Sequence, residues 1–429
     1  MLSLNKLSIY VITFLLIVET FLKSELYSVL IYFSIIGIIA INKSFYTDKL
    51  QKTLIGILSS IILISFGNYY FDFRVVDYNI SITDLVRDLW FFSRPIFLLI
   101  IGYNLGKKAR PEELVKVIII VGIISATLHY IELIQFGSLD LFEGRKSSEL
   151  SGSSLIEALL FSIIIQNLFG EKKEKFESDY LNKWSLIILL LFITPSVVLY
   201  LSRTMFIVIF AFLFFGFELY KINRRSIVIS SAIILLVGSL FIMESSEGIF
   251  INKIQRSVSE VGIGSDFENR MQENDLASVW RGYEAFRAVS QLFENNMFVW
   301  FFGEGAGSKV DLKFYQKLGG QEFRFIPQLH NGYVMVLFKS GIVGLLLYLY
   351  LMFKLTFGVD ERSFLPVRNR KHMVNLVRGI GLSLFIISIV ISGIYNKGEV
   401  GRVVLLYGAI LGSLTYQGPY VIGLLKIEQ

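Results

Sequence analysis

Long apolar stretches, separated by shorter polar segments, dominate the chain. A helix needs about 20 apolar residues to cross the hydrocarbon core of a bilayer. About twelve stretches of that kind lie near 7–22, 26–42, 53–70, 88–106, 112–136, 150–169, 184–201, 203–219, 226–243, 330–354, 377–395 and 402–424. The pattern predicts an all-α polytopic membrane protein with about twelve transmembrane helices.

One polar segment, residues 244–329, is much longer than the others. It divides the chain into transmembrane helices over 1–243, a loop subdomain over 244–329, and transmembrane helices over 330–429. Within the loop, WRGYEAFRAVSQLF has a helical period. Its apolar face would carry Tyr283, Phe286, Val289 and Phe293, and its solvated face Arg281, Glu284, Arg287 and Gln291. We therefore expect a partly helical loop.

The distribution of Lys and Arg sets the orientation, because cytoplasmic loops of membrane proteins are enriched in both. With the N-terminus inside, the inner segments hold 21 basic residues and the short outer segments hold 8. Both termini are predicted to be cytoplasmic, which places the loop 244–329 on the outer side.

Composition supports this class of protein and excludes others. Hydrophobic residues make up 54% of the chain and charged residues 18%, which is typical of a membrane-embedded protein. The absence of cysteine excludes disulfides, thiolate metal sites and cysteine nucleophiles. The net charge of +6 does not indicate nucleic-acid binding, because the basic residues lie mainly in inner loops. The loop carries no metal-binding pattern, and we expect no cofactor.

The stretch HNGYVMVLFKSGIVG opens the tenth apolar segment, where the outer loop meets the membrane. In a continuous helix, eleven residues turn through about 1100°, so His330 and Gly341 would share one face. Gly341 and Gly344 would let a neighbouring helix approach closely. Two interpretations stand: a functional histidine at the outer surface, or His330 and Asn331 as the cap of an interfacial helix.

Two arginines stand near the same outer surface, Arg203 in SRT and Arg94 in WFFSRPIF. An arginine inside an apolar stretch needs an anion or a carboxylate to offset its desolvation, and its planar fork matches phosphate oxygens. The alternative for Arg94 is a structural pair with Glu132, Glu157 or Asp88. For Arg203 the alternative is an interfacial arginine that snorkels to water.

Three further features favour structural roles. Lys339, about nine residues into the tenth segment, is predicted to pair with a buried carboxylate. His129 is predicted to be neutral and hydrogen-bonded to a glutamate, with Glu132 one turn away. The GEGAGS stretch, 303–308, follows no strand and is interpreted as a tight turn that ends the loop helix rather than as a dinucleotide site.

Location limits the chemistry that these residues can perform. The outer face of a bacterial membrane offers no ATP or sugar nucleotide, so a transferase there needs an activated donor carried by lipid. Arginines beside a histidine suit a lipid diphosphate donor: arginine holds the leaving diphosphate, and histidine accepts a proton from an acceptor hydroxyl.

The same residues resemble the O-antigen ligase/polymerase superfamily. The resemblance rests on His330-Asn331 followed by Gly341-Ile342-Val343-Gly344, on Ser202-Arg203-Thr204, and on Arg281 with Ala285 ahead of Gly303-Glu304-Gly305. Ala285 departs from the Leu or Trp usual in the family. The resemblance covers roughly 200–345, and the first 200 residues match in topology alone.

The resemblance implies a GT-C-like fold with a large periplasmic loop, and an inverting, metal-independent glycosyltransferase. Its donor would be an undecaprenyl-diphosphate-linked oligosaccharide in the bacterial inner membrane. The expected site has His330 as the catalytic residue, Arg203, Arg281 and Arg94 on the diphosphate, and Asn331, Gly341 and Gly344 in support.

Two acceptors fit this reading: another lipid-linked repeat unit in a polymerase, or lipid A–core in a ligase. The polymerase is favoured because the loop holds 9 basic and 12 acidic residues, and so offers no basic platform for a phosphorylated core. A chain-length regulator in the membrane is an expected partner of a polymerase. A polysaccharide transporter or flippase is the alternative from another class, although no matching halves are found.

Overall fold

The computed structural model describes residues 4–21, 25–41, 48–71, 80–135, 154–171, 175–176, 181–200, 203–221, 273–318, 321–361, 369–389, 393–395 and 399–415. These ranges are mainly helical. The helices up to residue 216 are α1 (Leu4–Phe21), α2 (Glu25–Ile41), α3 (Lys49–Phe71), α4 (Ile82–Gly106), α5 (Pro111–Gln135), α6 (Ser154–Phe169), α7 (Lys183–Leu199) and α8 (Arg203–Gly216). The later ones are α11 (Glu273–Phe293), α12 (Met297–Phe302), α13 (Gly332–Phe357), α14 (Arg370–Ile387) and α15 (Glu399–Leu414), with the 3₁₀ turn η5 (Gly393–Tyr395).

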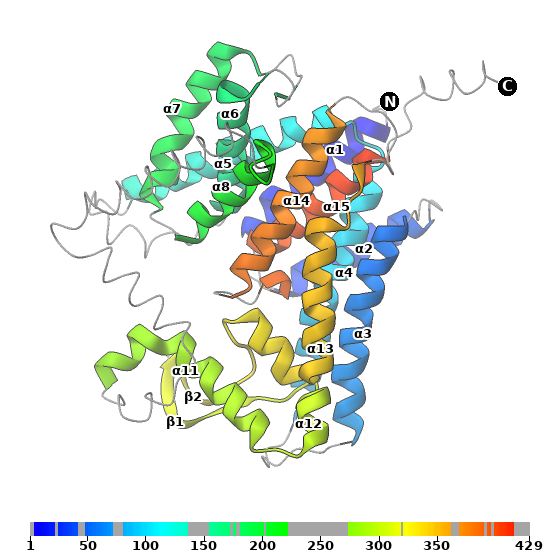
Figure 1. The fold of residues 1–429 in the computed structure, drawn as a ribbon, viewed down its shortest axis with the longest axis vertical. Coiled ribbons are helices and arrows are strands. Elements are labelled where there is room, and N and C mark those ends of the chain that lie inside the picture. The colour runs from blue at the N-terminus through cyan, green and yellow to red at the C-terminus, as the bar shows by residue number, and fades with distance from the viewer. Residues whose placement is uncertain are drawn as a thin grey trace.

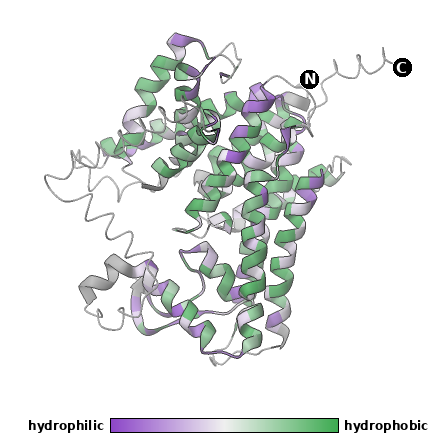
Figure 2. Cartoon of the chain, viewed as in Figure 1, coloured by the Kyte–Doolittle hydropathy of each residue, from purple (hydrophilic) through white to green (hydrophobic). Residues whose placement is uncertain are grey.

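A helix stands at eleven of the twelve predicted spans. The remaining prediction, near 226–243, lies outside the described residues, as does the part of the predicted loop up to 272. Among the described helices, α3, α5 and α13 are long and apolar enough to cross a membrane. Most residues along the described helices are apolar (Figure 2). The chain is therefore a helical membrane protein, as predicted.

Helices α4 and α15 pack with their backbones almost in contact, although they are far apart in the sequence (Figure 1). A Cβ atom on Gly102 or Gly106 of α4 would overlap the backbone of Leu405 or Ala409 of α15, and one on Gly412 would overlap Tyr103. Small residues permit this close approach. Such packing is common between membrane helices, because the surrounding lipid removes the hydrophobic driving force for their association.

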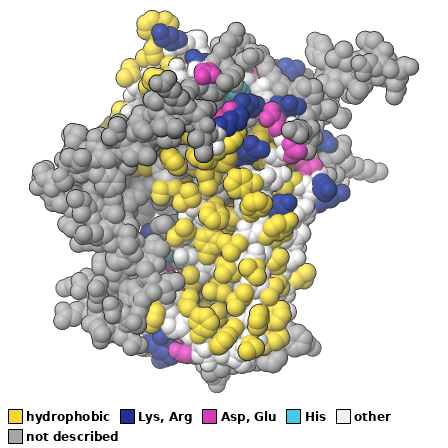
Figure 3. Space-filling view, in the orientation of Figure 1, with side chains coloured by type: hydrophobic (Ala, Val, Ile, Leu, Met, Phe, Trp, Pro, Cys, Tyr) yellow, Lys and Arg dark blue, Asp and Glu magenta, His cyan; other side chains and the backbone are white. Residues whose placement is uncertain are grey.

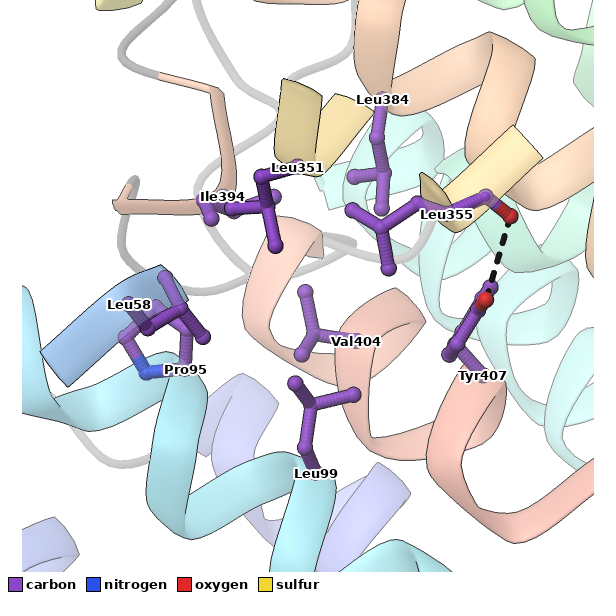
Figure 4. A pocket seen from close by; sticks show the side chains of 9 residues that line it. All are labelled: Leu58, Pro95, Leu99, Leu351, Leu355, Leu384, Ile394, Val404 and Tyr407. Atoms are coloured by element: carbon purple, nitrogen blue, oxygen red, sulfur yellow. Dashed lines mark hydrogen bonds between the residues drawn. The ribbon is translucent and has the colours of Figure 1, made fainter. Parts of the chain in front are cut away.

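This half of the bundle also encloses an apolar pocket (Figure 4). Leucines, Pro95, Ile394 and Val404 line it, from α3, α4, α13, α14, η5 and α15. The one hydroxyl in the lining, on Tyr407, donates to the carbonyl of Leu355 at 3.1 Å. The lining offers no charged group, so the pocket does not suit a diphosphate.

Helices α5, α6 and α7 contribute to a buried polar cluster. His129 Nδ1 lies 2.8 Å from Ser196 Oγ, and Ser196 donates to Glu157 at 2.6 Å. Tyr200 stacks on the His129 ring and also donates to Glu157, at 3.2 Å. The prediction that His129 hydrogen-bonds directly to a glutamate was wrong: its partner is a serine, which relays the contact to Glu157 rather than to Glu132.

Helix α13 folds back on itself, and the prediction of one continuous helix from His330 was wrong. Gly341 has φ 66° and ψ −167°, outside the helical region. Tyr333, before the bend, and Tyr348, after it, have ring centroids 5.4 Å apart. Fifteen residues of straight helix would separate them by about 22 Å. We call residues 332–340 the half-helix and residues 341–357 the column (Figure 1).

The bend is completed by the turn 303–308. The last carbonyls of a helix lack intrahelical donors, and here those of Phe338 and Lys339 accept from the backbone N–H groups of Glu304 and Gly305, at 2.8 and 3.1 Å. Gly303, Gly305 and Gly307 all have positive φ, so the stretch is a tight turn as predicted. It follows α12 rather than the predicted loop helix, α11.

Gly341 lets a neighbouring helix, α12, approach closely, as predicted, whereas Gly344 has no other described helix against it. A Cβ atom on Gly341 would overlap the backbone of Phe301 and Phe302 at the end of α12. A Cβ atom on Gly344 would overlap the side chain of Ser340, within α13 itself. Both glycines make room for the bend.

Gly341→Ala is expected to destabilise the protein strongly. The backbone conformation of Gly341 is one that costs other residues about 1–3 kcal/mol, and overlap with α12 adds about 1–3 kcal/mol. Gly56→Ala in α3 is the matched control, because nothing lies within 4 Å of a Cβ there. The measurement is the melting temperature of both variants in detergent. Equal melting temperatures would contradict the bend.

The described part of the loop 244–329 contains a hairpin that was not predicted from the sequence. Strands β1 (Val310–Leu318) and β2 (Gln321–Ile326) pair antiparallel, with Val310 opposite Ile326 and an irregularity in register between Asp311 and Gln316. Helix α11 packs against β1. This small α/β unit lies at the end of the column where α12 is found (Figure 1).

Candidate active site

His330 and Glu284 form a hydrogen-bonded pair between α11 and the start of α13. His330 Nδ1 lies 2.8 Å from Glu284 Oε2, and the backbone N–H of His330 donates to the same oxygen at 3.3 Å. The Glu284 side chain is 3% exposed, whereas that of His330 is 48% exposed. A buried carboxylate therefore holds a histidine whose ring reaches the surface.

The hydrogen bond between His330 and Glu284 determines which ring nitrogen of a neutral His330 can accept a proton. An ionised carboxylate only accepts hydrogen bonds, so Nδ1 carries the proton that Glu284 accepts. Nε2 is then left with a lone pair. The carboxylate would also stabilise the imidazolium formed when Nε2 takes up a proton, which is the role of the acidic member in a catalytic triad.

The predicted orientation of α11 was wrong, and Glu284 was missed for that reason. Glu284, Arg287 and Gln291 were assigned to a solvated face, but all three are buried. Phe293, assigned to the apolar face, is 52% exposed. Glu284 lies three residues before Arg287 on this helix, and nothing else in the sequence indicated a function for it.

Strand β1 explains why this polar face is buried. Tyr283 donates to the carbonyl of Leu312 at 2.6 Å, and Arg287 Nε donates to that of Asp311 at 3.2 Å. Gln291 accepts from the N–H of Asp311 at 2.9 Å and donates to the carbonyl of Lys309 at 3.1 Å. Buried polar groups need such partners. The bonds fix α11, and hence Glu284, against a rigid hairpin.

Asn331 and Gly332 fix the other member of the pair. The Asn331 side chain accepts from the backbone N–H groups of Tyr333 and Val334 and so caps α13. The N–H of Gly332 donates to the carbonyl of Ser388 at the end of α14, at 2.8 Å. Asn331 thus has the capping role that was one of the two interpretations, whereas His330 is bound to Glu284.

The three arginines of the predicted site have different positions. Arg281 lies on α11, three residues before Glu284, so the two project from neighbouring turns of one helix, and it is half-buried. Arg203 is the first residue of α8, and its side chain lies outside the described residues. Arg94 is buried in the middle of α4. The structure thus brings Arg281 close to the pair, while the roles of all three remain predictions.

Lys339 pairs with a buried carboxylate, as predicted. Its Nζ lies 2.7 Å from Asp88 Oδ2 of α4, and both side chains are at most 3% exposed. Lys339 also donates to the carbonyl of Ser308, and Asp88 accepts from the N–H of Gly307 at 2.7 Å. The pair joins α4, the turn 303–308 and the bend of α13.

Fold and site together define a helical membrane protein in which a carboxylate from α11 holds a histidine at the start of a bent helix. Residues 186–349, from α7 into the column of α13, match a family described as O-antigen ligase. No curated protein matches the chain. The resemblance noted in the sequence is confirmed: the chain contains a domain of the O-antigen ligase/polymerase superfamily.

Proposed function

We propose that this protein is a polymerase of O-antigen or a related surface polysaccharide. It joins undecaprenyl-diphosphate-linked repeat units by inverting glycosyl transfer at the periplasmic face of the bacterial inner membrane, with both termini in the cytoplasm. The observation that carries the proposal is the His330–Glu284 pair, which lies within the segment that matches the O-antigen ligase family.

The chemistry follows from the free Nε2 of His330. An acceptor hydroxyl gives its proton to Nε2 as its oxygen attacks the anomeric carbon of the donor sugar. The bond from that carbon to the diphosphate oxygen breaks, and undecaprenyl diphosphate leaves with the electron pair. Glu284 accepts from Nδ1 throughout and stabilises the imidazolium. No metal ion is needed in this scheme.

Arginines would stabilise the charge that develops on the leaving diphosphate. Arg281 is one candidate, and it lies one turn from Glu284 on α11. Arg203, in SRT, and Arg94 are the further candidates. Asn331, Gly341 and Gly344 support the site indirectly, by capping α13 and permitting its bend.

The acceptor distinguishes the proposed polymerase from a ligase. The loop 244–329 carries 9 basic and 12 acidic residues, so it offers little attraction to the phosphorylated core of a lipopolysaccharide. A lipid-linked repeat unit makes no such demand. A chain-length regulator is the expected membrane partner of the polymerase.

The test is an in vitro reaction with the purified protein in detergent. The protein receives only undecaprenyl-diphosphate-linked repeat units, in the presence of a chelator, and the products are resolved by size. We expect a ladder of polymers from the wild type and none from His330→Ala or Arg203→Ala.

The other outcomes decide between the alternatives. Transfer that occurs only after lipid A–core is added would identify a ligase. Product lost on chelation would overturn the metal-independent scheme. If no product formed with either acceptor, the result would favour a transporter of lipid-linked glycans.

A further inference from the structure

Helix α12 exposes three large apolar side chains on one face. Met297 is 65% exposed, Phe298 39% and Phe301 45%. Residues three and four apart share one face of a helix, so these three side chains form a single patch. Val299, on the other side of α12, is fully buried. We call Met297, Phe298 and Phe301 the α12 patch.

The helix lies beside two of the segments that are apolar and long enough to cross a membrane. Its C-terminal residue is followed by Gly303, whose carbonyl accepts from the side chain of Asn68 of α3. Ala306 donates to the carbonyl of Ser65 at 2.8 Å. Ser65 and Asn68 both belong to the candidate span Lys49–Tyr69. The end of α12 is therefore level with the last turns of a transmembrane segment.

The length of the column gives an independent indication of how deep α12 lies in the membrane. Because α13 bends at Gly341, only the 17 residues to Phe357 run straight, and they cover about 25 Å. A bilayer's hydrocarbon core is about 30 Å thick. Helix α12 packs across the outer end of the column, where Phe301 and Phe302 contact Gly341. It occupies the depth that the column does not reach.

The exposed surface beside α12 is also of the kind that faces lipid. Leu63 of α3 is 72% exposed, and Leu346 and Phe353 of the column are 60% and 53% exposed. Hydrophobic side chains cover the face of the molecule formed by α3 and α13 and continue to its lower end (Figure 3), where α12 lies in Figure 1. The α12 patch continues this surface.

We propose that α12 is immersed in the outer leaflet of the membrane and that the α12 patch contacts lipid acyl chains. The exposed polar residues just before it, Glu294 and Asn296, would lie at the level of the headgroups. An apolar face of this kind binds a membrane in the plane of the interface.

The consequence concerns the rest of the outer loop. Helix α12 joins α11, which carries Glu284, to the turn 303–308, which completes the bend of α13. Immersion of α12 would anchor both at the membrane surface. The His330–Glu284 pair would then stay at a constant height relative to any substrate whose carrier is a lipid.

The absence of native cysteine makes a direct test possible. Single cysteines at Met297 and Phe301 are labelled with a nitroxide in the full-length protein, reconstituted in phospholipid nanodiscs. Relaxation by oxygen, which enriches in acyl chains, is compared with relaxation by a water-soluble nickel chelate. Leu63→Cys is the lipid-facing control, and Tyr315→Cys, on the exposed hairpin, is the aqueous control.

We expect Met297→Cys and Phe301→Cys to show the high ratio of oxygen to nickel relaxation seen at Leu63→Cys. A ratio equal to that of Tyr315→Cys would place α12 in water and overturn the proposal. Protection from both reagents would overturn it as well, because it would indicate a protein partner, such as a second copy of the chain. The readout needs no substrate, so it stands apart from the proposed reaction.

Discussion

Glu284→Gln is expected to lower kcat by about 10²–10⁴-fold, the usual contribution of a positioned general base, because it removes the carboxylate that supports His330 in that role. Glutamine can still accept the hydrogen bond from His330 Nδ1, but it carries no charge to stabilise the imidazolium. The loss should therefore fall on kcat rather than on KM, and Glu284→Gln should approach the defect of His330→Ala. The measurement is the initial rate of glycosyl transfer with a lipid-linked donor.

Glu294→Gln is the matched control for this prediction. Glu294 lies just after α11, ten residues beyond Glu284, but it is exposed. Its substitution should leave both kcat and the melting temperature unchanged. If Glu284→Gln retained wild-type kcat while still folding, the carboxylate would have no part in the reaction, and His330 would have to act without it.

Asp88→Asn is expected to destabilise the protein by about 3–5 kcal/mol, because it leaves a buried lysine charge without its carboxylate. Lys339 and Asp88 are both almost fully buried, 2.7 Å apart. The measurement is the free energy of unfolding in detergent micelles. Combining Lys339→Met with Asp88→Leu should recover part of the loss, since no charge is then stranded. The recovery should be incomplete, because Gly307 and Ser308 lose their partners.

Glu361→Gln provides the comparison for an exposed pair. Glu361 lies 3.6 Å from Arg370, and both side chains are partly exposed. Such pairs contribute about 0–1 kcal/mol. If Asp88→Asn and Glu361→Gln changed the free energy of unfolding equally, water would have to reach the Lys339–Asp88 pair in the folded protein, which would contradict its burial.

Hydropathy predicted the helices well because each one had to satisfy its own backbone inside the membrane. The pairing of Lys339 was predictable for a related reason: a buried ammonium needs a carboxylate, whatever the details of the fold. The tight turn at 303–308 followed from its three glycines. These features depend on local sequence and on the cost of burial.

The predictions were wrong where a segment distant in the sequence determines the local structure. The polar face of α11 is buried because β1 offers it backbone partners, and a helical period cannot reveal which face those partners cover. Gly341 sits in a sequence that reads as one continuous span, yet α12 and the turn 303–308 make a bend possible there. His129 binds Ser196, 67 residues away, rather than a nearby glutamate.

The bend in α13 also bears on how the protein is assembled. The 26 residues of α13, most of them apolar, have the length of a single membrane span when they are synthesised. The N–H groups that satisfy the carbonyls of Phe338 and Lys339 belong to Glu304 and Gly305, which are synthesised earlier. The turn 303–308, which stabilises the bend, is therefore synthesised before α13. A chain whose 303–308 turn is lost would insert α13 as an ordinary straight span, with Tyr333 far from Tyr348 instead of packed against it.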